Sequence, residues 1–243
     1  MNQYNLVHIL SFTILPIGLY FALYFILKNK SEKSQKHLLI GICCFDILLY
    51  AIYKIYQAFI YDGYNFVLIY NLPLHFCNIN LVLLPLAIIT ENKTLMAYQV
   101  YFGTLLAFFA LTAIDPSFRG KPFFEFSCLV YYYYHSMLTI IPFILIKIKL
   151  FKPSLKNLWH PIVLMIVLTA LVHILNIVLR STGIGPNANY FYTFGLVGDP
   201  FTEIFKSIIP YNFFYLIPIL LIIFIPYILL ILLLYRIFTR IRK

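Results

Sequence analysis

Long apolar stretches divide the chain into seven segments, each close to the length that a helix needs to cross a membrane. That length is roughly 17–25 mostly apolar residues. No stretch shows the regular alternation of apolar and polar residues that a β-barrel strand has, so the spans are predicted to be helices. The predicted spans are Asn5–Leu27, His37–Ile60, Leu72–Ile89, Leu95–Ile114, Phe123–Ile146, Trp159–Leu179 and Phe213–Tyr235. The pattern predicts an all-α membrane protein, a seven-transmembrane helix bundle that forms one domain over residues 1–243.

The composition supports a membrane protein and excludes a water-soluble globule. Apolar residues make up 63% of the chain and charged residues only 11%, whereas an ordinary soluble domain is about half apolar and about a quarter charged. Aromatic residues reach 19%, which also excludes a disordered chain because such chains are poor in aromatic side chains.

The basic residues indicate how the bundle is oriented. The net charge is +10, from 18 Lys and Arg against 8 Asp and Glu. The basic residues on one side of the predicted bundle are Lys28, Lys30, Lys33, Lys36, Lys93, Lys147, Lys149, Lys152, Lys156, Arg236, Arg240, Arg242 and Lys243. Those on the other side are Arg119, Lys121, Arg180 and Lys206. Because basic loops stay in the cytoplasm, the N-terminus is predicted outside and the C-terminus in the cytoplasm.

The positions of the basic residues also decide which partners the positive charge indicates. Lysines next to membrane spans mark topology and contact anionic lipid headgroups. We therefore expect membrane lipids as partners and no nucleic acid. The abundance of Ile, Lys, Asn, Tyr and Phe is typical of an AT-rich bacterial genome, so the predicted location is a bacterial plasma membrane, with the chain crossing it several times.

Side chains capable of chemistry fall into one layer beneath the predicted outer surface. Counted along the helices at about 1.5 Å per residue, this layer lies roughly 7–10 Å deep. It contains Lys54, His75, Cys77, His135 and His173, and Asn78 directly follows Cys77. Polar residues within spans usually face the bundle interior or a cavity, so this layer is the predicted site.

Cys77 and a histidine from another helix suggest nucleophilic catalysis. A thiol needs a neighbouring base or cation to form the reactive thiolate. His75 is two residues away and on a different face of the helix, so His135 or His173 is the better candidate for the base. Asp115, at the outer end of the fourth span, is a candidate to orient that histidine. A cysteine with a histidine transfers acyl groups through a thioester, and this chemistry needs no cofactor.

One segment carries a family resemblance. The run Leu72-Pro73-Leu74-His75-Phe76-Cys77-Asn78, ahead of Leu83-Leu84-Pro85-Leu86, resembles the signature of the bacterial YwaF-like integral membrane family. That family is related to eukaryotic transmembrane acyltransferases that remodel ether phospholipids. Thr112-Ala113-Ile114-Asp115-Pro116, then His135, then Asn189-Tyr190 follow in the family's order.

The resemblance implies a role for two of these residues. It makes Cys77 the residue that carries the acyl group and His135 the histidine that acts with it, on a phospholipid or lysophospholipid. Ser136 departs from the family, where a glycine is expected after the histidine.

Other functions remain open at this point. A lipid hydrolase would use the same residues with water as acceptor. The Lys-rich loops occupy matching places in spans one to three and five to seven, as in a small-solute transporter or a substrate-binding membrane subunit, although transport sites usually lie nearer the midplane. His75, Cys77, His135 and His173 are also acceptable metal ligands. Considered alone, His173 is interpreted as a residue that makes a hydrogen bond between helices. Considered alone, Cys77 is interpreted as a small apolar side chain.

Overall fold

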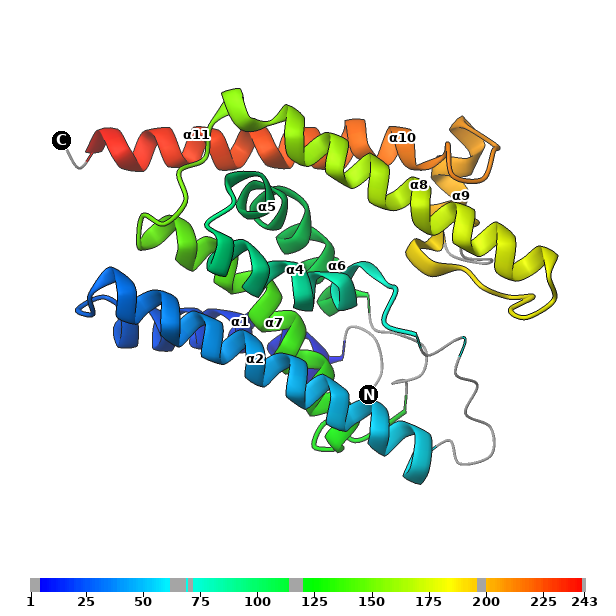
Figure 1. The fold of residues 1–243 in the computed structure, drawn as a ribbon, viewed down its shortest axis with the longest axis horizontal. Coiled ribbons are helices and arrows are strands. Elements are labelled where there is room, and N and C mark those ends of the chain that lie inside the picture. Colours follow the sequence, from blue (N-terminus) through cyan, green and yellow to red (C-terminus); the bar gives the residue numbers. More distant parts are fainter. Residues whose placement is uncertain (1–4, 62–68, 70–71, 114–119, 196–199, 242–243) are drawn as a thin grey trace. The chain divides into compact units, whose positions relative to one another are not determined.

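The computed structural model describes residues 5–61, 69, 72–113, 120–195 and 200–241, and all regular structure in these residues is helical (Figure 1). The chain forms two compact units. The first comprises Met1–Phe66 and Phe76–Lys152, and the second comprises Val67–His75 and Pro153–Lys243.

The first unit contains the helices that correspond to the first five predicted spans. They are α1 (Leu6–Leu27), α2 (Glu32–Tyr56) continued by the π-helical η1 (Gln57–Tyr61), α4 (Phe76–Thr90), α5 (Lys93–Tyr98), the π-helical η3 (Gln99–Gly103), α6 (Thr104–Thr112) and α7 (Phe126–Lys147). The predicted fourth span is therefore three consecutive helical segments, and a π-helical turn joins α5 to α6. Such π-helical turns are rare in proteins, and those that occur frequently lie at functional sites.

The second unit contains the last two predicted spans. Its elements are η5 (Leu155–Asn157), α8 (Trp159–Ser181), η6 (Tyr190–Tyr192), α9 (Pro200–Ile208), α10 (Leu216–Ile219), the π-helical η7 (Leu220–Phe224) and α11 (Ile225–Ile241). The short helix α9 lies between the sixth and seventh predicted spans.

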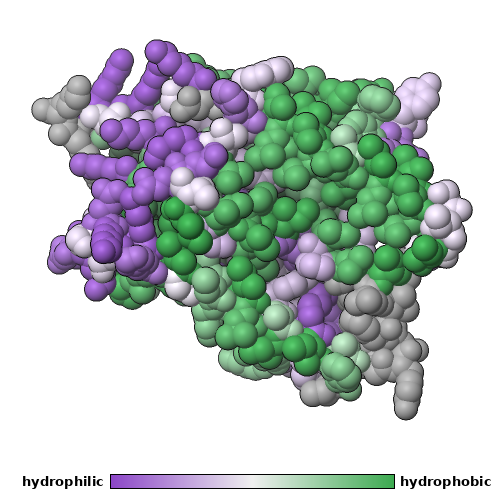
Figure 2. Space-filling model, in the orientation of Figure 1, coloured by the Kyte–Doolittle hydropathy of each residue, from purple (hydrophilic) through white to green (hydrophobic). Residues whose placement is uncertain are grey.

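The membrane character is confirmed by the helices themselves. Among the described residues, six helical stretches are long and apolar enough to cross a membrane, and α4 is a shorter apolar helix. At about 1.5 Å per residue, the 15 residues of α4 span about 22 Å. Many large apolar side chains lie on the surface, as the broad green areas of Figure 2 show. This pattern is expected where the surrounding solvent is lipid, and it confirms an all-α, multi-pass membrane protein.

Helix α7 forms the centre of the first unit. It packs against α1, α2, α4 and α6, and most of its side chains are buried. Two polar contacts close the C-terminal end of α6, whose last carbonyls have no partner within the helix. His8 of α1 donates from Nε2 to the carbonyl of Leu111 over 2.9 Å, and the Tyr131 hydroxyl donates to the carbonyl of Ala110. The start of α1 and the first half of α7 are thereby fixed to the end of α6.

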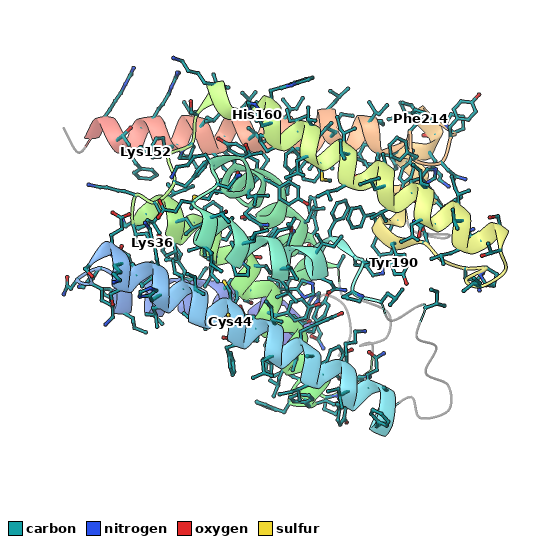
Figure 3. All side chains as sticks on the ribbon, in the orientation of Figure 1. Lys36, Cys44, Lys152, His160, Tyr190 and Phe214 are labelled. Atoms are coloured by element: carbon teal, nitrogen blue, oxygen red, sulfur yellow. The ribbon has the colours of Figure 1, made fainter. Side chains whose placement is uncertain are left out.

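Three basic loops of the first unit meet at one end of it. Lys36 Nζ lies 2.5 Å from a carboxylate oxygen of Glu91, and Lys93 Nζ donates to the carbonyl of Leu150 over 3.1 Å. The hydrogen bond and the charge of Lys36 lower the pKa of Glu91, which lies in a loop between helices. Lys36 and Lys152 are labelled at this end in Figure 3. These contacts agree with the prediction that the three loops share one side of the membrane.

The predicted orientation is tested by labelling introduced cysteines. In a chain whose four cysteines are replaced by alanine, we expect Ile184→Cys to react with a membrane-impermeant maleimide in intact cells. Lys30→Cys should react only in inverted vesicles, because basic loops stay in the cytoplasm. Both side chains are exposed, so the reaction of each cysteine depends only on which side of the membrane the maleimide can reach. Labelling of Lys30→Cys in intact cells would contradict the orientation.

Candidate functional site

Cys77 lies in the first turn of α4 and within electrostatic range of tyrosines from three other segments. It is a free, half-buried thiol. Tyr50 of α2, Tyr98 of α5 and Tyr134 of α7 all lie close enough to interact electrostatically with Cys77. This agrees with the packing, because α4 contacts α2, α5, η3 and α7. The thiol therefore lies at a point in the first unit where several helices converge.

His135 is held in a defined orientation on α7. Its side chain is 3% exposed, and Nδ1 is 2.8 Å from the carbonyl oxygen of Tyr131. A carbonyl can only accept a hydrogen bond, so Nδ1 carries the proton and the lone pair of the neutral ring is on Nε2. Histidine in this tautomer acts as a base through Nε2.

Tyr134 contacts one of the predicted catalytic residues and lies within electrostatic range of the other. Its ring packs on the His135 ring, with 4.0 Å between centroids and 33° between planes. It also interacts electrostatically with Cys77. The structure thus places Cys77 and His135 on two helices that pack together, with Tyr134 packed on His135 and within electrostatic range of Cys77.

Ser136, the departure from the expected glycine, fits the buried helix. Its side chain is fully buried, and Oγ donates to the carbonyl of Tyr132 over 2.6 Å. Serine often makes this bond to the preceding turn of a helix. The substitution therefore leaves no unsatisfied hydroxyl beside His135.

Lys54 and Asn78 extend the same region. Lys54 Nζ donates to Gln57 Oε1 over 3.0 Å and lies 5.8 Å and 5.5 Å from the ring centroids of Tyr50 and Tyr53. Tyr50 also lies within electrostatic range of Cys77, so Lys54 and the thiol belong to the same part of the first unit. Asn78 is half-buried, and since it follows Cys77 directly it points to a different face of α4.

An apolar groove of about 300 Å³ runs between α2 and α7. It is lined by Phe45, Leu49, Phe126, Leu129, Val130 and Tyr133. At its base the Tyr133 hydroxyl is hydrogen-bonded to the buried carboxyl group of Asp46. With that hydroxyl engaged, the groove presents an almost entirely hydrocarbon wall.

In the second unit, polar side chains of α8 bind the loop that follows that helix. Asn176 is fully buried; its Nδ2 donates to the Tyr190 carbonyl over 2.8 Å and its Oδ1 accepts from the Tyr190 N–H over 2.9 Å. Nδ2 also donates over 3.0 Å to Thr193 Oγ1, which is hydrogen-bonded to His173 Nδ1 at 2.9 Å. Buried loop backbone needs such partners. His173 thus makes a structural hydrogen bond, as its simpler interpretation predicts, but to a loop residue and not to another helix.

Asn189 and Arg180 continue this network. Asn189 Nδ2 donates to the Gly195 carbonyl over 2.7 Å, and its Oδ1 accepts from the Phe194 N–H over 3.0 Å. Arg180 Nε donates to the Ala188 carbonyl over 2.6 Å, and its guanidinium lies 4.1 Å from the Phe194 ring centroid. The loop is therefore a defined structure and not an open linker.

Tyr190 and His75 complete the network. Tyr190, labelled in Figure 3, is buried, and its hydroxyl donates to the carbonyl of Ile69. The His75 ring lies 5.3 Å, between centroids, from the rings of both Tyr190 and Tyr192. These contacts give Tyr190 and His75 structural roles within the second unit, and a role in support of Cys77 stays a prediction for both.

Two sequence hypotheses have other outcomes. Asp115 lies outside the described residues. For a metal site, neither unit groups three or more His, Cys, Asp or Glu side chains within the part of the chain that the structure describes. His135 instead engages Nδ1 with the Tyr131 carbonyl.

Sequence reasoning missed a buried amide pair one turn along α4 from Cys77. Asn80 and Gln99 are both fully buried, and Gln99 Nε2 donates to Asn80 Oδ1 over 3.3 Å. A Cβ atom at Gly103 would lie 2.6 Å from Gln99 Oε1 and 3.3 Å from Asn80 Nδ2. The pair therefore needs a glycine at the end of η3. A signal was present in the sequence: Asn80 lies three residues after Cys77, on the same helical face.

Replacing this glycine tests the pair. We expect Gly103→Ala to lower the free energy of unfolding by about 1–3 kcal/mol, because a methyl group is forced into a packed interior. The matched control is Gly41→Ala on α2, where nothing lies within 4 Å of the added Cβ. It should leave stability unchanged or raise it slightly. Thermal unfolding in detergent measures both, and equal stability of the two variants would contradict the assignment.

The long apolar helices, the lipid-facing surfaces and the polar side chains buried between helices define this as a polytopic α-helical membrane protein. The model of the TMEM164 family matches residues 3–234. The chain belongs to the TMEM164 family. Comparison with curated proteins and with solved structures gives no match.

Proposed function

We propose that the protein is a membrane acyltransferase or transacylase that moves a fatty acyl chain between a phospholipid and a lysophospholipid through a thioester on Cys77. The observation that carries this proposal is the packing of α4, which carries Cys77, against α7, which carries His135. On α7 the Tyr134 ring packs on the His135 ring and lies within electrostatic range of Cys77. The resemblance of the Leu-Pro-Leu-His-Phe-Cys segment to the YwaF-like family, which is related to eukaryotic transmembrane acyltransferases, supports the same assignment.

The first half of the reaction transfers the acyl group to the protein. His135 Nε2 accepts the proton from the Cys77 thiol, and the thiolate adds to the carbonyl carbon of the phospholipid acyl ester. The ester C–O bond then breaks, and the departing lysophospholipid oxygen takes the proton from His135. The products are an acyl thioester on Cys77 and a free lysophospholipid.

The second half returns the acyl group to a lipid. The hydroxyl of an acceptor lysophospholipid gives its proton to His135 and attacks the thioester carbonyl. The C–S bond breaks, and the Cys77 sulfur recovers the proton from His135. With water in place of the acceptor lipid, the same steps hydrolyse the phospholipid.

Two features of the first unit suit a lipid substrate. The apolar groove between α2 and α7 offers hydrocarbon walls of the kind that an acyl chain prefers. Lys54 supplies a cation on α2, the helix that also carries Tyr50. A lysine acts as a point charge for phosphate, so Lys54 is suited to the headgroup phosphate of the substrate.

Cys77→Ala tests the nucleophile. On incubation with phospholipid, we expect the wild-type protein to gain the mass of one acyl group, which hydroxylamine removes because it cleaves thioesters. Cys77→Ala should show no adduct. Cys128→Ala is the matched control, since Cys128 is a buried thiol in the same unit, and it should acylate as the wild type does. An adduct that persists in Cys77→Ala would contradict the mechanism.

His135→Asn tests the base. Asparagine can still donate to the Tyr131 carbonyl but supplies no basic nitrogen. We expect the acylation rate at neutral pH to fall about 10²–10⁴-fold, the usual contribution of a general base, and to recover partly as pH rises and the thiol ionises without help. A merely structural role would give no such recovery.

The control for this variant is His8→Gln, which changes another buried histidine bonded to a backbone carbonyl. Its pH–rate profile should match that of the wild type. A His135→Asn variant with the wild-type rate at neutral pH would refute the assignment.

A further inference from the structure

Several buried hydrogen-bond donors near Cys77 have no partner among the described residues. They are the hydroxyls of Tyr50 and Tyr98 and the Nδ2 group of Asn80. Tyr98 and Asn80 are fully buried. Buried polar groups in native proteins are hydrogen-bonded in the great majority of cases, and in a membrane interior water is scarce. A cluster of such donors therefore points to a bound group that accepts hydrogen bonds.

The positions of these donors relate them to the thiol. Tyr50 and Tyr98 both interact electrostatically with Cys77, and they approach from α2 and α5, two helices that pack against α4. Asn80 lies three residues after Cys77, so its side chain shares a face of α4 with the thiol. Its other amide atom, Oδ1, is already held by Gln99, which fixes the plane of the amide and leaves Nδ2 as the donor.

The chemistry of the cluster limits what it can bind. The donors are two hydroxyls and one amide, all neutral. A phosphate would require a lysine or arginine to balance its charge, and Lys54, 5.8 Å from the Tyr50 ring centroid, is the cation that we assign to the headgroup phosphate. A carbonyl oxygen needs only neutral donors, and those donors gain strength when the oxygen becomes negative in a tetrahedral intermediate.

We infer that Tyr50, Tyr98 and Asn80 bind the carbonyl oxygen of the acyl group that is attacked by Cys77 and then carried on it. This inference rests on the proposed function. It assigns these residues the task of stabilising the oxyanion, in addition to the nucleophile and base already described. The same donors hold the thioester carbonyl while the acceptor lipid enters.

Removing these hydroxyls should not weaken the fold. A buried hydroxyl without a partner costs free energy in the folded state. Replacing it with hydrogen therefore leaves the fold as stable as before or makes it more stable. We expect Tyr50→Phe, Tyr98→Phe and the double variant to melt at or above the wild-type temperature. Loss of stability would indicate that the hydroxyls have a structural partner and would overturn the inference.

The acylation rate supplies the functional readout. In single-turnover experiments with phospholipid, each single variant should form the thioester about 10²–10³-fold more slowly, which is the usual effect of losing one oxyanion donor. The double variant should be slower than either. Tyr132→Phe is the matched control: its hydroxyl is also buried and without a partner in the described structure, but the sulfur with which it interacts is that of Cys128. It should acylate at the wild-type rate.

The outcomes separate the two proposals. A wild-type rate in the double variant, with a normal adduct on Cys77, would overturn the oxyanion assignment alone. An equal rate loss in Tyr132→Phe would overturn it too, because the effect would not depend on position. Absence of any adduct on the wild-type protein would contradict the proposed function and, with it, this inference.

Discussion

The structure depends above all on one constraint: a polar group inside a bilayer has no water to bond and must find its partner in the protein. The contacts that tie distant segments together follow from it. His8 satisfies the carbonyl of Leu111 at the end of α6, and Asn176 satisfies both backbone groups of Tyr190. In each case a single polar side chain fixes the end of a helix or the course of a loop. Apolar contacts with lipid are non-directional and do not determine how the helices are arranged. Each of these hydrogen bonds requires a particular partner at a particular position.

The same constraint distinguishes structural from reactive polar groups. In the second unit, His173 and Asn176 are both hydrogen-bonded to the hydroxyl of Thr193. Asn189 donates to the backbone carbonyl of Gly195. Around Cys77, by contrast, Tyr50 and Tyr98 have buried hydroxyls with no partner in the described residues. Unsatisfied groups of this kind reduce stability. Two such hydroxyls near the thiol are explained if the missing acceptor is the carbonyl oxygen of a substrate. The proposed acyl transfer would then account for the burial of these groups.

Much of the fold follows from the sequence, because the length of an apolar stretch determines whether it crosses a membrane. The first predicted span, Asn5–Leu27, corresponds to α1 at Leu6–Leu27, and the sixth agrees with α8 in the same way. Apolar length does not reveal the π-helical turn at Gln99–Gly103 or the helix α9. In the structure Gln99 of η3 bonds to Asn80 of α4, and Lys206 of α9 donates to the carbonyl of Phe194. Residue type and family resemblance are enough to predict Cys77 and His135 as the catalytic pair. The supporting residues Tyr134 and Asn80 can be identified only from the packing of the helices.

The central claim is that Cys77 carries an acyl group between two lipids, and a pulse-chase experiment tests it most directly. The protein is mixed with phospholipid bearing an isotopically labelled acyl chain, digested, and analysed by mass spectrometry before and after addition of unlabelled lysophospholipid. We expect label on the peptide containing Cys77, followed by its loss as labelled phospholipid forms from the added acceptor. Label on another peptide, or new phospholipid formed while Cys77 never carries label, would contradict the claim.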